Sequence, residues 1–167
     1  MNADELRAVQ APLKQAYRNR PDAARVVSRA EGSLDRNDIA VNVDAWHGTV
    51  VAGLHKAGGG SGELACSADM LLEALVGCAG VTLRAVATAM GVTVHSGKVI
   101  AEGVWDARGT LGVDRAAPVG LSEITLRFEV DCDADAAKLE RMIQTTERYC
   151  VILQTLKAPP RIAMEIV

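Results

Sequence analysis

Apolar residues recur at helical spacing in the first part of the chain and again near its middle. In residues 3–18 this spacing predicts an amphipathic helix with Pro12 inside it. The apolar positions of this helix are Leu6, Val9, Leu13 and Tyr17. Between Ser67 or Asp69 and Gly91, apolar side chains occur on nearly every face. We therefore predict a long helix there, buried on nearly every side, that begins at one of these capping residues and ends at the glycine.

A third helical pattern lies near the end of the chain. It begins after Asp133 or Asp135, either of which is a suitable cap, and it stops at Pro159. Its apolar stripe consists of Leu139, Met142, Ile143, Thr146 and Cys150. Beyond the prolines, apolar and polar residues alternate, which predicts a final strand through Ile162 and Ile166.

Alternating or β-branched runs predict the remaining strands. Three short runs precede the long helix, at Arg25–Leu34, Ile39–Ala45 and Thr49–Leu54. The turn residues of Asp35–Asp38 indicate a hairpin between the first two. Two longer strands are predicted after the helix, separated by a glycine- and proline-containing loop over Arg108–Gly120; they are Val94–Trp105 and Ser122–Asp131.

This order of elements predicts an α+β fold with antiparallel sheets around two core helices. The chain of 167 residues is long enough for one domain with a substantial core. A helix that is apolar on all sides is most economically covered by a second subunit, so we expect a homodimer.

Composition and charge narrow the class of protein. The net charge of −3 and the pI near 5.6 argue against nucleic acid as a partner. The charged residues Glu73 and Arg84 within the longest apolar stretch argue against a membrane span. Because the charged N-terminus does not resemble a signal peptide, we expect a cytoplasmic protein whose thiols are normally reduced.

Several common catalytic and metal-binding motifs do not occur. The glycine-rich segment Gly58–Gly62 lacks the Lys and Ser/Thr of a phosphate-binding loop. His47, His55 and His95 do not have the spacing of metal ligands, and no Cys-x-x-Cys pair is present. The candidates that remain for chemistry are the thiols.

The four cysteines differ in their surroundings. We expect Cys66 and Cys132 to be structural or incidental. Cys78 lies in the middle of the long helix, where a thiol usually behaves as a small hydrophobic side chain and burial raises its pKa. A reactive Cys78 therefore requires a cation from elsewhere in the fold. Cys150 lies on the core-facing stripe of the last helix, so the two thiols have the potential to meet, although spacing alone does not show it.

Two cysteine segments resemble a known family. Residues 69–83, Asp-Met-Leu-Leu-Glu-Ala-Leu-Val-Gly-Cys-Ala-Gly-Val-Thr-Leu, look like the first cysteine helix of the OsmC/Ohr family of osmotically inducible and organic hydroperoxide resistance proteins. Residues 150–156, Cys-Val-Ile-Leu-Gln-Thr-Leu, resemble its second motif, commonly Cys-Pro-Val-x-x-Thr-Leu. The resemblance covers residues 25–167, the expected OsmC-like domain, and leaves residues 1–24 as an N-terminal helical extension.

The resemblance implies an intertwined homodimer that reduces organic hydroperoxides through cysteines, without metal, haem or flavin. Cys78 would be the peroxidatic thiol, oxidised to a sulfenic acid, and Cys150 the resolving thiol, which forms a disulfide that an external dithiol reduces. Arg36 is the best match to the family's activating arginine, with Arg29 as the rival. Asp69 takes the position of the carboxylate that orients it.

The chain also departs from the family pattern. Val151 replaces the common proline, so the last helix is expected to continue through this point. Asp69 is one methylene shorter than the usual glutamate, and Glu73 is one turn further along.

Two functional hypotheses follow, beside the alternative of a structural or interaction protein with incidental thiols. The first is a thiol peroxidase for apolar organic hydroperoxides, because the residues around Cys78 are aliphatic. The second is a dimeric OsmC-like protein that binds a small ligand and whose thiols are unreactive or regulatory.

Overall fold

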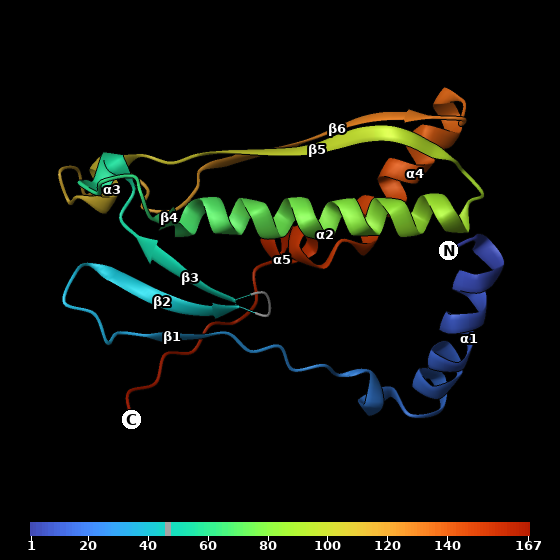
Figure 1. Ribbon diagram of the computed structural model, residues 1–167, viewed down its shortest axis with the longest axis horizontal. Coiled ribbons are helices and arrows are strands. Elements are labelled where there is room, and N and C mark those ends of the chain that lie inside the picture. The colour runs from blue at the N-terminus through green and yellow to red at the C-terminus, as the bar shows by residue number, and fades with distance from the viewer. Residues whose placement is uncertain (46–47) are drawn as a thin grey trace. The chain divides into compact units, whose positions relative to one another are not determined.

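A computed structural model describes residues 1–45 and 48–167 as two compact units. Residues 1–20, 74–100 and 126–167 form the first unit, and residues 21–73 and 101–125 form the second. The expectation for His47 lies outside the described residues. Three elements contribute residues to both units: helix α2 (Ser67–Ala89) and strands β5 (Val94–Val104) and β6 (Glu123–Cys132) (Figure 1).

The first unit is mainly helical and contains the core of the molecule. Besides its parts of α2, β5 and β6, it contains α1 (Ala3–Asn19), α4 (Ala136–Tyr149) and α5 (Val151–Lys157). Its buried cluster consists of Leu83, Val86, Ala87, Val92 and Met142. This cluster joins one face of α2 to α4, and partly buried residues of β6 such as Phe128 and Val130 pack against it.

Helix α1 agrees with the amphipathic helix predicted for residues 3–18. Its start is fixed by a capping box, in which the side chain of Asn2 accepts from the N–H of Glu5 and the Glu5 carboxylate accepts from the N–H of Asn2. Pro12 lies inside the helix without ending it.

Helix α2 confirms the long apolar helix and ends at Ala89, just before Gly91, whose φ of +62° suits glycine. By length and composition α2 is long and apolar enough to cross a membrane. The core helix of a soluble protein has the same properties. Leu75, Ala79 and Leu83 are buried within the first unit, which fits the interpretation as a core helix.

The prediction of one helix that continues through Cys150 is wrong, because the chain forms two helices there. Asp135 caps α4 through the N–H of Lys138. The helix stops at Cys150, whose ψ of 107° is extended, and α5 begins at the next residue. The side chain of Gln154 donates to the free carbonyl of Glu147, and Lys157 forms an ion pair with the Glu147 carboxylate. These contacts stabilise the break although no proline is present.

The second unit contains a four-stranded sheet in the order β1 (Glu31–Ser33), β2 (Ala40–Ala45), β3 (Gly48–Gly53) and β4 (Ala65–Cys66). The first three strands form an antiparallel meander, and β4 is parallel to β3. The predicted hairpin is therefore present. The first strand is shorter than Arg25–Leu34, because residues 25–30 are exposed and have no apolar surface to cover.

Short helical turns occur between the longer elements of this unit. The 3-10 turn η1 (Pro21–Ala24) follows α1 along the chain, and η2 (Lys56–Gly58) lies at the start of the glycine-rich segment. Within the predicted loop after β5, α3 (Ala107–Thr110) forms because the Asp106 carboxylate accepts from the N–H of Arg108.

Strands β5 and β6 form a separate two-stranded sheet. The N–H of Asp133 donates to the carbonyl of Thr93 at one end, and the N–H of Ser122 donates to Val104 at the other, so the strands are antiparallel. The predicted final strand is absent from the described residues, since residues 159–167 have no regular structure. Ile162 and Ile166 are exposed, and alternation alone does not make a strand when no neighbouring strand accepts its hydrogen bonds.

Candidate functional site

Cys78 and Cys150 meet in the first unit. Cys78 lies in the middle of α2 and is half-buried, whereas Cys150 is fully buried at the break between α4 and α5. The Cys150 thiol lies close enough to the Cys78 sulfur to lower the pKa of Cys78 by hydrogen bonding, and neither thiol is in a disulfide. Two cysteines more than seventy residues apart in sequence are therefore in direct contact.

Hydrogen bonds determine the pKa of Cys78. Burial raises the pKa of this thiol, but several donors stabilise its thiolate and together they outweigh burial. In decreasing order these donors are the N–H of Ile152, the Cys150 thiol, the N–H of Val151 and the Thr82 hydroxyl. The pKa of Cys78 therefore lies below its ordinary value, which increases the fraction of nucleophilic thiolate.

The pKa of Cys150 moves in the opposite direction. Burial raises it, and the hydrogen bond to Cys78 raises it further because that bond keeps the proton on Cys150. The N–H of Leu153 lowers it by more than the bond to Cys78 raises it, and the N–H of Ile152 lowers it slightly, but burial and the charge of Cys78 keep the pKa above its ordinary value. The pair is thus asymmetric, with Cys78 disposed to lose a proton and Cys150 disposed to keep one.

The donors to Cys78 come from two places. Thr82 lies one turn after Cys78 on α2, and its hydroxyl donates to the Cys78 carbonyl oxygen at 2.8 Å, so it shares its proton between that oxygen and the sulfur. The N–H groups of Val151 and Ile152 are free for Cys78 because the first N–H groups of a helix have no partner within it. We did not identify these three residues from the sequence. The spacing of four between Cys78 and Thr82 was a usable signal, whereas the backbone donors depend on the break at Cys150.

Arg36 and Asp69 belong to the second unit. The Arg36 guanidinium pairs with the Asp38 carboxylate through two hydrogen bonds of 2.7 and 2.6 Å and lies 3.4 Å from the Asn42 amide oxygen. The bond to Asp38 raises the pKa of Arg36 and lowers that of Asp38. Asp69 is exposed in the first turn of α2. Arg29, the rival candidate, pairs with Glu31. The roles assigned to Arg36 and Asp69 stay predictions.

The remaining candidate residues, one histidine and two cysteines, make contacts that are typical of structural positions. The His55 ring accepts from the N–H of Ala57 and contacts the Trp105 ring edge-to-face. Cys132 packs against the buried cluster of the first unit, and Cys66 ends β4. Within residues 1–45 and 48–167, no group of three or more His, Cys, Asp or Glu side chains has the arrangement of a metal site.

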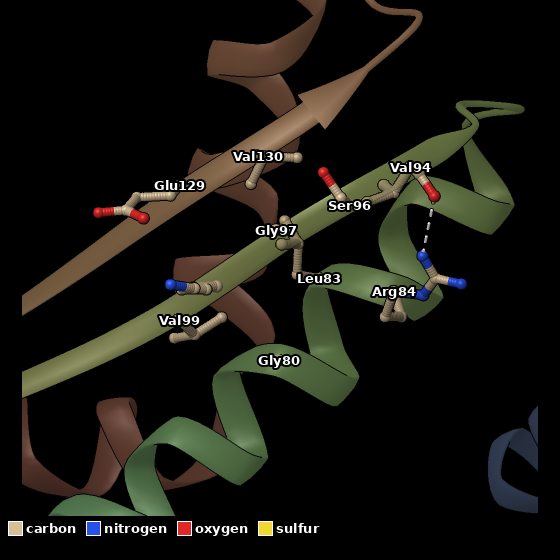
Figure 2. Close-up of a pocket in the computed structure, with 10 residues that line it drawn as sticks. Gly80, Leu83, Arg84, Val94, Ser96, Gly97, Val99, Glu129 and Val130 are labelled. Carbon is tan, nitrogen blue, oxygen red and sulfur yellow. Dashed lines mark hydrogen bonds between the residues drawn. The ribbon is translucent and has the colours of Figure 1, made fainter.

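A small cavity of about 240 Å³ lies between α2 and the β5–β6 pair (Figure 2). Arg84 crosses one end of it and donates to the carbonyl oxygen of Val94 at 3.2 Å. The residues that line this cavity include no cysteine, and Gly80, Leu83 and Val99 make much of its surface apolar. This cavity therefore lacks the nucleophile that the cysteine pair provides.

Comparison with known proteins identifies the class. A family model described as OsmC-like protein matches residues 60–165, and the chain therefore belongs to the OsmC-like family. This result and the structural matches confirm both the resemblance to the OsmC/Ohr family and the α+β fold. A comparison with curated protein sequences gave no significant match.

Among solved structures, the chain is similar to an OsmC-like protein from Mycoplasma pneumoniae, with a TM-score of 0.67 and 16% identity over 80% of this chain and 89% of that one. An organic hydroperoxide resistance protein from Legionella pneumophila gives a TM-score of 0.58 and 14% identity, covering 81% and 92%. The organic hydroperoxide resistance protein OhrB of Bacillus subtilis gives 0.53 and 12%, covering 80% and 93%. At these identities the matches establish the fold.

Proposed function

We propose that this protein is a thiol-dependent peroxidase that reduces organic hydroperoxides to alcohols. The observation that carries the proposal is the contact between Cys78 and Cys150, with donors that lower the pKa of one thiol and a bond that raises the pKa of the other. Structurally similar proteins described as organic hydroperoxide resistance proteins support the same chemistry.

The reaction proceeds in three steps. The Cys78 thiolate attacks the distal oxygen of the hydroperoxide, the O–O bond breaks, and the alkoxide takes a proton from solvent and leaves as the alcohol. The sulfur of Cys150 then attacks the resulting sulfenic acid, which forms a disulfide and releases water. An external dithiol reduces this disulfide and is itself oxidised to a disulfide, which restores both thiols.

The N–H groups of Val151 and Ile152 and the Thr82 hydroxyl stabilise the attacking thiolate. Arg36 is proposed as the cation that stabilises the charge on the leaving oxygen, and Asp69 as the carboxylate that orients it. The reaction uses electrons from the thiols, so we propose that it requires no metal or organic cofactor.

The protein is proposed to act as a homodimer in the cytoplasm. Val81 on α2 is 72% exposed. The alternating apolar residues Ile162, Met164 and Ile166 of the C-terminal segment are also exposed. Such apolar surface is unusual on a soluble monomer and supports association with a second copy. A reducing compartment would supply the dithiol that the cycle needs.

The proposal is tested by treating the reduced protein with cumene hydroperoxide and mapping its thiols by mass spectrometry. We expect a prompt Cys78–Cys150 disulfide and one alcohol formed per disulfide. Cys78→Ser should abolish peroxide consumption, whereas Cys150→Ser should stop after oxidation of Cys78. Cys132→Ser is the matched control and should leave the reaction unchanged.

Other outcomes decide against the mechanism. Peroxide consumption that persists in Cys78→Ser would refute the role of Cys78. Two thiols that stay free in excess peroxide would favour the alternative, an OsmC-like protein that binds a small ligand.

A further inference from the structure

A second cavity of about 470 Å³ lies in the first unit between α1, α2 and α4. Leu6, Gln10 and Lys14 form its wall on α1, where their spacing of four places them along one face of the helix. Its volume is within the range of sites that bind small organic molecules. Helix α1 lies outside residues 60–165, the part matched by the family model.

The lining has the composition of a site for an amphipathic molecule. Apolar side chains form most of the wall on α2, including Val86 and Met90. Polar groups from α2 and α4, among them Thr82 and Tyr149, lie at other positions of the lining. A largely apolar surface with a few polar groups is typical of small-molecule sites.

Lys14 is the single charged residue among those that line the cavity. In the part of the chain that the structure describes, its ammonium forms no ion pair. The acids nearest on α1 have other partners, since Asp4 pairs with Arg7 and Glu5 with the N-terminus. An ammonium without a counterion beside an apolar surface complements a ligand with an anionic group.

We infer that this cavity binds a small apolar organic anion, with its apolar body against α2 and its anionic group at Lys14. The site adjoins the cysteine pair, because Thr82 lines the cavity and its hydroxyl also contacts Cys78. The inference goes beyond the proposed peroxidase activity and does not depend on it, since binding at Lys14 requires no reaction at either thiol.

Two fluorescent probes with nearly the same apolar body test this inference in the full-length protein. Anilinonaphthalene sulfonate carries an anionic group, and phenylnaphthylamine lacks it. We expect Lys14→Gln to weaken binding of the sulfonate by about three- to tenfold, the range of a partly exposed ionic interaction, and to leave phenylnaphthylamine unchanged. Lys14→Arg should restore sulfonate binding. Arg20→Gln, which removes the same charge from the C-cap of the same helix, is the matched control and should have no effect.

A second variant tests the cavity itself. Ala85→Phe fills the space beside α2 and should weaken both probes, with circular dichroism to verify that the protein remains folded. The site does not exist if neither probe binds, or if both affinities are unchanged in Lys14→Gln and in folded Ala85→Phe, because binding is then to other apolar surface. Equal weakening of both probes by Lys14→Gln would overturn the anionic assignment. Cys78→Ser should bind the sulfonate normally, so failure of the peroxidase proposal remains distinguishable from failure of this one.

Discussion

The backbone N–H of Val151 donates a hydrogen bond to the sulfur of Cys78. This donor exists because residue 151 is valine, whereas the family motif commonly has proline, which has no N–H. The replacement does not extend the preceding helix, since Cys150 remains extended between α4 and α5. The chain therefore gains a donor to the thiolate at the position where the family pattern differs.

Val151→Pro tests this donor with little change in the fold. Proline is favoured at the first position of a helix, and the extended backbone of Cys150 suits a residue that precedes proline. We expect the pKa of Cys78 to rise, because one donor to its thiolate is lost. The measurement is the rate of iodoacetamide alkylation of Cys78 as a function of pH.

Val151→Ala is the control for this experiment, because it shortens the side chain and retains the N–H. Its alkylation profile should match that of the wild-type protein. If the profiles of Val151→Pro and Val151→Ala coincide, the N–H of Val151 does not stabilise the thiolate.

Thr82 contributes to the same site through its side chain. Thr82→Val has nearly the same shape but removes the hydroxyl that stabilises the Cys78 thiolate, so the pKa of Cys78 should rise. Below this pKa, peroxide consumption should fall by up to about tenfold for each unit of pKa shift, because the thiolate fraction falls. Thr82→Ser retains a hydroxyl and should behave like the wild type. A normal pH profile in Thr82→Val would show that the hydroxyl contributes only to helix packing.

The opposite pKa shifts of the two thiols predict selective labelling. Below the ordinary pKa of a thiol, Cys78 has more thiolate than an unperturbed cysteine, and Cys150 has less. A brief treatment with iodoacetamide near pH 7 should therefore modify Cys78 first, and the preference should narrow as pH rises toward the pKa of Cys150. Peptide mass spectrometry gives both rates. Faster modification of Cys150 would reverse the assignment of the two thiols.

The hydrogen bond to the Asp133 carboxylate predicts that the stability of the fold depends on pH. Its carboxylate accepts from the N–H of Thr93 at 2.8 Å, which lowers its pKa below 3.8. A lowered pKa in the folded state contributes stability above the unfolded-state value, and this contribution is lost as pH falls through the folded-state value. The neutral variant Asp133→Asn should thus have a lower Tm at pH 7, and the difference should shrink in acid. A difference in Tm that is constant with pH would contradict this role.

The sequence predicted the parts of the fold that depend on local patterns. Helix α2, the hairpin of β1 and β2, and the long strands β5 and β6 follow from periodicity and from turn residues. The predicted C-terminal strand failed because a strand also requires a partner, and the alternating pattern contains no information about one. The first strand was predicted too long for a related reason, since residues 25–30 lack a surface to cover.

The sequence predicted the two cysteines of the site but not the hydrogen-bond donors that surround them. Resemblance to the family identified Cys78 and Cys150, and the structure brings these thiols together. We expected a cation to be needed for a low pKa, whereas hydrogen bonds from Ile152, Val151 and Thr82 lower it in the first unit. Backbone donors are invisible to residue-type reasoning because every residue except proline has one.

The break between α4 and α5 places the donors to the Cys78 sulfur beside exposed side chains. A thiolate is a strong hydrogen-bond acceptor, and a disulfide sulfur is a weak one, so oxidation removes the acceptor of the Val151 and Ile152 N–H groups. Those groups would then need another acceptor. The flanking side chains of Tyr149 and Val151 are exposed, so a change in hydrogen bonding at this break would reach the protein surface.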